Sequence, residues 1–325
     1  MIKYLNSFFE LLLFSLLILI SVLLAVGGNY SSAVLSGINL WIACVLPSLF
    51  PYFFITAILS GLKVTGKVSS MLTPFTRALF NTGGATGYAF MMSVISGYPM
   101  GAKIVSDLKN SNLITKSESV RAAAFCSTSS PMFILGSVGN IMFGSPSFGV
   151  LLFLVHILSA TSVGFIFSFY KRSDKPQNTN TALPLKSTDN VLYESAYSAV
   201  ISVLIVGSLI TVFYLLTEIL LSLNLLTPII NALYALTGDI NLSSGIVLGA
   251  FECTRGLKVL SKGKITFLTL PVCAAICGFG GLSVMMQSLA YLKKAKIKTA
   301  PFVLSKLLSA VLNFLIGTIF SLFIF

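Results

Sequence analysis

Long uncharged apolar runs constrain this chain more than any other feature of its sequence. The run from Ser7 to Gly28 has a single charged residue, and several later runs are of comparable length. About 20 apolar residues cross a bilayer as one helix. Only 9% of the residues are charged, against roughly 25% in soluble domains. Because backbone polar groups in lipid must be paired within the segment, we expect an all-α polytopic protein of the cell membrane.

The charge balance fits the same class of protein. Lys and Arg number 21 against 9 Asp and Glu, and in membrane proteins such an excess collects in cytoplasmic loops. No nucleic-acid-reading motif interrupts the apolar runs, so the expected partner is the lipid bilayer and not nucleic acid. The run from Ser7 to Gly28 is long for a signal peptide and lacks an obvious cleavage site. We interpret it as a retained transmembrane helix.

Residues that could support catalysis or metal binding are scarce. The five cysteines lie in apolar surroundings, where a free cysteine behaves as a small buried hydrophobic residue. His156 is the chain's one histidine and lies within an apolar run, where packing with a local hydrogen bond is a simpler role than catalysis or proton relay. The sequence contains no P-loop, nucleophile elbow or paired intramembrane aspartates. We predict no enzyme activity, no metal and no cofactor.

The chain repeats itself. The stretch LTPFTRALFNTGG begins at Leu72 and LTPIINALYALTG at Leu226, while HILSA from His156 corresponds to KLLSA from Lys306. These matches follow in the same order at nearly constant spacing, on either side of a polar segment. We therefore divide the chain into an N-terminal transmembrane helix, a first gate-type repeat, a polar linker and a second gate-type repeat, at residues 1–37, 38–170, 171–192 and 193–325.

Positive charges change sides between the two repeats. In the first, Lys63 and Lys67 follow the first spanning helix, and the stretch before the last helix is uncharged. In the second, the bases from Lys293 to Lys298 instead precede the last helix. Under the positive-inside rule this exchange predicts inverted repeats, a recurrent plan of transporters. Each repeat then needs an odd number of full crossings, so one of its segments must be a re-entrant hairpin.

The stretch SGYPMGAK, which begins at Ser96, is the candidate for that hairpin. Glycine permits a tight turn and proline ends a half-helix. Such backbone is tolerated at membrane depth only inside protein or beside a watery cavity, so we place a solute site here, near the glycines of the second repeat. The lysine of this stretch either attracts a charged solute or anchors the hairpin at the membrane surface. The assigned residues are Gly97, Tyr98, Pro99, Gly101 and Lys103.

Two further stretches carry polar groups at predicted breaks. Four hydroxyl residues precede Pro131, and they either bond to neighbouring helices or face a solute, the reading that we favour. In the corresponding stretch of the second repeat, glycines replace the hydroxyls and an amide follows. Glu252 and Arg255 lie three apart on one helical face, either as a local ion pair or as solute ligands. The other candidates are Ser127, Thr128, Ser129, Ser130, Gly278, Gly280, Gly281 and Gln287.

Several of these motifs resemble one family. SGYPMGAKIVSDL, FCSTSSPMFILGSVG, MFGSPSFG and FGGLSVMMQS are similar to the sporulation integral membrane protein YlbJ family, also called SpoVV, over most of the chain from about Leu46 onward. The resemblance implies a protein of endospore formation, in a membrane around the forespore, that moves dipicolinic acid from the mother cell to the forespore. It also implies a relation to nucleoside-recognition or gate domains. Arg255 occupies a variable position of the family's second-half motif, Glu-x-Thr-x-Gly.

The expected function is therefore transport of a small organic anion, dipicolinate by resemblance. One alternative is a nucleoside or nucleobase transporter, and another is a non-transporting scaffold for spore-envelope assembly. A scaffold does not need helix breaks at matched positions in both repeats, whereas a transporter does. The sequence contains no ATP-binding motif, and it leaves a homo-oligomer open.

Overall fold

The computed structural model describes residues 30–61, 65–176 and 190–324, and every regular element in these ranges is a helix. The transmembrane helix predicted within Ser7 to Gly28 lies outside the described residues. The first half of the chain contains α2 (Tyr30–Leu40), the π-helix η1 (Trp41–Val45), α3 (Leu46–Gly61), α4 (Thr65–Phe80), α5 (Gly84–Ser96), α6 (Met100–Asn110), α7 (Lys116–Phe125), the π-helix η2 (Met132–Met142) and α8 (Pro146–Phe167).

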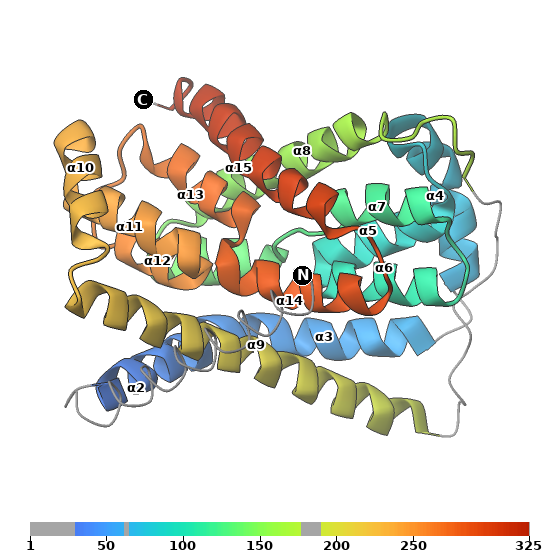
Figure 1. Ribbon diagram of the computed structural model, residues 1–325, viewed down its shortest axis with the longest axis horizontal. Coiled ribbons are helices and arrows are strands. Elements are labelled where there is room, and N and C mark those ends of the chain that lie inside the picture. The colour runs from blue at the N-terminus through green and yellow to red at the C-terminus, as the bar shows by residue number, and fades with distance from the viewer. Residues whose placement is uncertain (1–29, 62–64, 177–189, 325) are drawn as a thin grey trace, which may run out of the picture.

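The second half presents the same order of helices. From α3 and α9 onward, each element of one half has a counterpart in the other, ending with α8 and α15 (Figure 1). The second half contains α9 (Val191–Ser222), α10 (Thr227–Thr237), α11 (Ile240–Phe251), α12 (Cys253–Leu260), α13 (Thr269–Phe279), α14 (Gly281–Lys294) and α15 (Thr299–Ser321).

Within the described residues, five helical segments are long and apolar enough to cross a bilayer. Large apolar side chains on their outer faces are exposed, such as Leu204 and Leu304, as expected where lipid covers the protein. The prediction of an all-α polytopic membrane protein is therefore confirmed. The five segments are Tyr30–Leu59, Pro146–Phe167, Val191–Ser222, Thr269–Lys294 and Thr299–Ser321.

The first long helices of the two halves pack antiparallel. The hydroxyl groups of Tyr30 and Ser222 lie 3.1 Å apart, and Gly37 packs against Thr211, so the start of α2 meets the end of α9 (Figure 1). Corresponding helices of inverted repeats run in opposite directions, as these do. The boundary drawn after residue 37 falls within α2, which continues through η1 into α3 as one span.

Each half contains a hairpin of two short helices. The helical structure is interrupted at the turn between them, and this interruption is called the break of the hairpin. In the first half α5 and α6 fold back at Gly97, and a Cβ added at Gly101 would lie 2.7 Å from the Ser93 side chain. In the second half α11 and α12 fold back at Glu252, and a Cβ added at Gly256 would lie 2.3 Å from the Cα of Gly249. In each hairpin a residue three or four positions before the break contacts a residue four positions after it, as in an antiparallel hairpin.

A longer helix in each half is interrupted where it meets the hairpin tip. In the first half the chain is irregular between the end of α7 and the start of η2, and in the second Gly280 separates α13 from α14. A Cβ on Gly97 would lie 2.8 Å from the backbone nitrogen of Ser130, and one on Gly281 3.0 Å from that of Cys253. Each hairpin break therefore touches the helix break of its own half.

Candidate functional site

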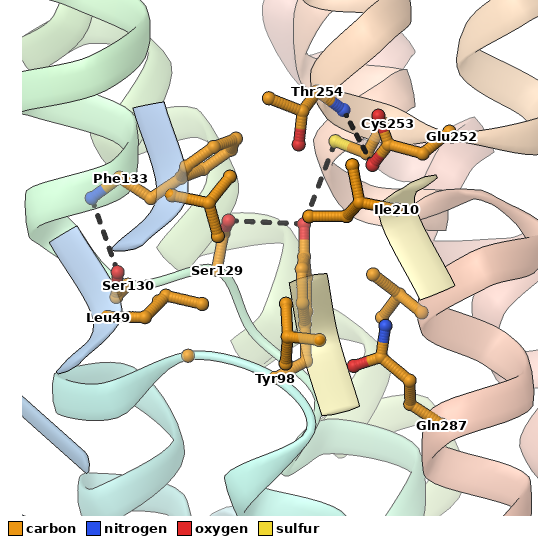
Figure 2. A pocket seen from close by; sticks show the side chains of 14 residues that line it. Leu49, Tyr98, Ser129, Ser130, Phe133, Ile210, Glu252, Cys253, Thr254 and Gln287 are labelled. Carbon is orange, nitrogen blue, oxygen red and sulfur yellow. Dashed lines mark hydrogen bonds between the residues drawn. The ribbon is translucent and has the colours of Figure 1, made fainter. Parts of the chain in front are cut away.

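The breaks of both halves meet around one small cavity, with α3, η1 and α9 closing its remaining side (Figure 2). Its volume is about 30 Å³, room for about two water molecules. The structure thereby brings together the predicted site residues Gly97, Tyr98, Ser129, Ser130, Glu252 and Gln287. The rest of the lining consists of Val45, Leu49, Phe133, Val206, Ile210, Cys253, Thr254 and Val284.

Tyr98 connects the two halves across this cavity. Its hydroxyl accepts a 3.1 Å hydrogen bond from Ser129 Oγ, and the Cys253 sulfur lies 3.8 Å away (Figure 2). The same hydroxyl donates to the Cys277 carbonyl at 3.5 Å. The preceding residue, Gly97, has φ of +79°, a conformation in which a side chain is strained. The glycine thus sets the turn that directs the tyrosine into the centre.

The hydroxyl run divides between the two roles predicted for it. Ser129 and Ser130 line the cavity. Thr128 instead bonds to Ser93, with 2.8 Å between the hydroxyl oxygens, and so joins the break to α5. Ser127 faces away from the cavity, toward Lys306 of α15. Interhelical bonding and cavity lining therefore each account for two of the four residues.

The corresponding break of the second half carries fewer polar side chains. Gly280 and Gly281 have φ of +81° and +77°, and the ring of Tyr98 packs against the first of them. Gln287, nearly two turns into α14, lines the cavity, and its side-chain oxygen has no hydrogen-bond partner among the described residues. Gly278 lies outside the cavity, where it packs against Asn313 of α15.

Glu252 lines the cavity and also caps α12. Its two carboxylate oxygens accept the backbone N–H groups of Thr254 at 3.1 Å and Arg255 at 2.6 Å. A carboxylate at a helix N-terminus satisfies unpaired donors and interacts favourably with the helix dipole. The side chain is 1% exposed, so this buried charge is held mainly by backbone dipoles.

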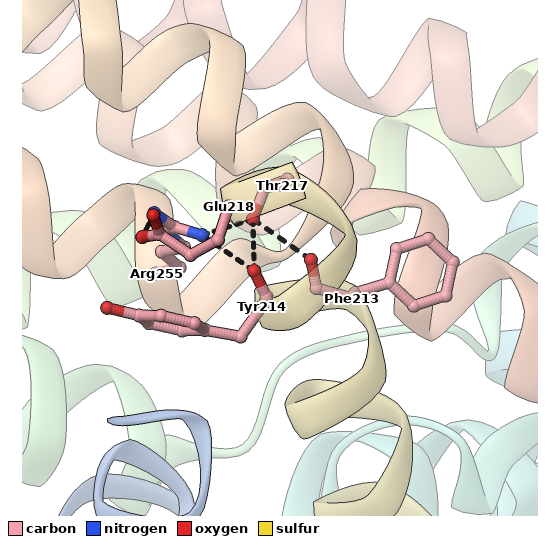
Figure 3. A network of polar contacts seen from close by, with 5 residues as sticks. All are labelled: Phe213, Tyr214, Thr217, Glu218 and Arg255. Atoms are coloured by element: carbon pink, nitrogen blue, oxygen red, sulfur yellow. Dashed lines mark hydrogen bonds and ion pairs between the residues drawn. The ribbon is translucent and has the colours of Figure 1, made fainter. Parts of the chain in front are cut away.

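Arg255 does not join the site, and the predicted pair with Glu252 does not form between the side chains. Its guanidinium group points to α9, where it donates to the Tyr214 carbonyl at 2.8 Å and to Thr217 Oγ1, and pairs with Glu218 (Figure 3). It also lies over the Tyr214 ring, 3.9 Å from the centroid. The Arg255 side chain projects from α12 toward α9. Its guanidinium group therefore binds the acceptors on α9 and does not extend into the cavity.

Three other predicted residues support the first hairpin without lining the cavity. Lys103 Nζ donates to Ser198 Oγ on α9 at 3.0 Å, which ties the hairpin to another helix; attraction of a solute and anchoring at the membrane surface both stay predictions. Gly101 allows α6 to approach the break after α7, because a Cβ there would lie 2.0 Å from the Cys126 carbonyl oxygen. Pro99 precedes the first turn of α6.

Two residues of the centre, His156 and Lys306, were not among the predicted site residues. His156 Nε2 accepts the backbone N–H of Ser129 at 2.9 Å, so its bond reaches another helix break and is not local. Lys306 Nζ lies 3.3 Å from the Ser127 carbonyl oxygen. They hold corresponding positions in HILSA and KLLSA, and a lone charge in an apolar helix was the signal that could have identified Lys306.

The chain is 30% identical over 301 residues to the sporulation integral membrane protein YlbJ of Bacillus subtilis strain 168, and this match covers 85% of this chain and 74% of that protein. No family model and no solved structure matches the chain.

Proposed function

Because the chain belongs to the family of the sporulation integral membrane protein YlbJ, we propose that it moves a small organic anion across a membrane around the forespore. The proposed solute is dipicolinic acid, carried from the mother cell to the forespore as the family resemblance implies. The chain is a multipass membrane protein of a sporulation family. Its transport activity, its solute and the membrane that it occupies are what we propose.

One observation carries this proposal: the points at which the helices of both halves are interrupted meet at one buried cavity. Irregular backbone at membrane depth persists only where protein or a watery cavity surrounds it. Paired broken helices near the middle of the membrane bind solutes in many secondary transporters, because they present backbone N–H and carbonyl groups. Hydroxyl groups of Ser129, Ser130 and Tyr98 add polar contacts at the same place.

The cavity is closed to a solute of this size. Pockets that bind small molecules usually measure about 300–1,000 Å³, well above the roughly 30 Å³ present here. Binding therefore requires the hairpins to move relative to α3 and α9. Polar contacts between them, among the described residues, include the Lys103–Ser198 bond, the Thr56–Ser96 bond and the Arg255–Glu218 pair, so we expect these contacts to change during transport.

A nucleoside transporter is the second candidate, and one observation favours it. The cavity wall contains the Glu252 carboxylate and the Gln287 amide and no lysine or arginine. Carboxylate and amide oxygens accept hydrogen bonds from sugar hydroxyls and base amino groups. An anion would instead need a positive charge close to the cavity.

Uptake by vesicles that contain only the purified full chain distinguishes these functions. We expect saturable uptake of labelled dipicolinate, recovered chemically unchanged inside, and little uptake of labelled uridine or adenosine. The matched control is the Gly97→Leu variant, in which the hairpin tip cannot pack against Ser130. Preferential nucleoside uptake would support the second candidate, and no uptake of either solute would favour the scaffold.

A further inference from the structure

Lys306 is a fully buried cation in the middle of an apolar helix. It is the one charged residue of α15, and its side chain is 1% exposed. The Nζ atom lies 3.3 Å and 3.4 Å from the carbonyl and hydroxyl oxygens of Ser127. Both distances exceed the 2.7–3.2 Å range of good N–H···O bonds. The ammonium group is therefore held loosely, by two atoms of a single residue.

Among the described residues, no carboxylate pairs with this cation. The one ion pair within 4.0 Å among the described residues joins Arg255 to Glu218. Glu252 is the carboxylate of the cavity wall, and its oxygens bind the backbone of α12. The titratable groups that interact with Lys306 are Tyr98, His156, Cys253 and Cys277. A buried charge without a partner is strongly unfavourable, so an anion that reached this place would be bound firmly.

Tyr98 connects Lys306 with the cavity. The Lys306 ammonium lies 5.5 Å from the centroid of the Tyr98 ring, and the Tyr98 side chain also lines the cavity. Lys306 itself is not part of the lining. A rotation of Tyr98, or a shift of the Ser127–Ser130 segment, would bring the ammonium group into contact with the cavity contents.

We infer that Lys306 binds a carboxylate of the solute once the Tyr98 ring moves aside. The inference rests on the proposed transport function and deepens it by naming the charged residue that selects anions. It also explains why a cavity wall without a base can belong to an anion transporter: the base lies behind the tyrosine. A planar dicarboxylate is the solute class that we expect in the opened cavity, because one carboxylate would reach Lys306 while the aromatic ring packs beside Tyr98.

The test compares two solutes of the same shape in vesicles with the purified full chain. Uptake of labelled dipicolinate is measured in competition with unlabelled dipicolinate and with pyridine-2,6-dicarboxamide, its neutral diamide. The variants are Lys306→Gln, which removes the charge, and Lys306→Arg, which keeps it. Lys298→Gln removes an exposed lysine just before the same helix and is the matched control.

We expect Lys306→Gln to raise the dipicolinate concentration for half-maximal uptake about tenfold or more, as for the loss of a hydrogen bond to a charged group. The same variant should no longer prefer dipicolinate to the diamide. Lys306→Arg and Lys298→Gln should keep that preference. Lys306→His, which copies the corresponding residue of the first repeat, serves if Lys306→Gln does not fold, and should show reduced preference as pH rises.

Two results would overturn the inference. One is wild-type uptake of dipicolinate with an unchanged preference in Lys306→Gln. The other is lowered thermal stability and lowered uptake in every Lys306 variant, with the remaining uptake still preferring dipicolinate to the diamide, which would make Lys306 a structural cap of the Ser127 carbonyl. If the wild-type chain itself takes up no dipicolinate, the proposed function fails before the inference is reached.

Discussion

Where the helices are interrupted, some backbone N–H and carbonyl groups have no helical partner. Single buried side chains bind these groups. Glu252 accepts two N–H groups of α12, His156 accepts the N–H of Ser129, and Lys306 contacts the Ser127 carbonyl. A backbone polar group left unpaired in lipid costs several kcal/mol. These residues therefore stabilise the breaks while the cavity is closed.

Gly97→Ala should destabilise the protein by about 1–3 kcal/mol, the usual cost of strained backbone. Its φ is +79°, and the added Cβ would lie 2.8 Å from the Ser130 nitrogen, so strain and crowding act together. Gly144→Ala is the matched control, because Gly144 has φ of +60° with no atom within 4 Å of the added Cβ. Thermal unfolding in detergent measures both. Equal losses would mean that the hairpin tip tolerates the side chain.

At the scale of helices, the second hairpin is fastened to α9 by one cation. Arg255 leaves α12 and binds a carbonyl, a hydroxyl and a carboxylate on the last turns of α9. The guanidinium group offers several donors in a fixed plane and also stacks on an aromatic ring, here Tyr214. The first hairpin is also tied to α9, since Lys103 donates a hydrogen bond to the Ser198 hydroxyl on the same helix.

Arg255→Gln should lower stability by about 1–3 kcal/mol through the loss of charged hydrogen bonds, without changing the affinity for the solute. Glu218→Gln should cost less, because the Glu218 side chain is 36% exposed and water can solvate its replacement. Thermal unfolding and concentration-dependent uptake separate the two effects. A raised half-maximal concentration with unchanged stability would return Arg255 to the solute site.

At the scale of the whole molecule, the prediction of inverted repeats places corresponding turns of the two halves on opposite sides of the membrane. The antiparallel packing of α2 and α3 against α9 requires this if each spans the membrane once. The α6–α7 turn and the α12–α13 turn correspond in the element order. Helix α6 also packs against α14, which brings the α6–α7 turn near the basic end of α14.

Cysteine labelling checks this arrangement. Asn110→Cys and Lys294→Cys should react with an impermeant maleimide from the cytoplasmic face, and Lys264→Cys from the opposite face. All three positions are exposed, whereas the five native cysteines are buried and should stay unlabelled. Labelling of Asn110→Cys and Lys264→Cys from the same face would contradict inverted repeats.

The sequence by itself determined the class of protein, the family and the location of the hairpin turn. Apolar length, low charge and the glycine–proline pattern around Gly97 act within a few residues or turns of the chain, so they can be read locally. The repeated LTP and LSA stretches likewise predicted matched segments, since a repeated sequence favours repeated local structure. The predicted domain boundary after residue 37 falls within one continuous helical span, Tyr30–Leu59.

Only the tertiary structure decided which polar groups share the cavity. Arg255 was predicted beside Glu252 from their spacing, yet the acceptors on α9 lie about 40 residues earlier in the chain. Lys306 was predicted only as part of a repeat match, yet α15 places it against a break that precedes it by 179 residues. The physical reason is that a side chain binds the partners that helix packing brings within reach, and packing depends on complementary surfaces far apart in sequence.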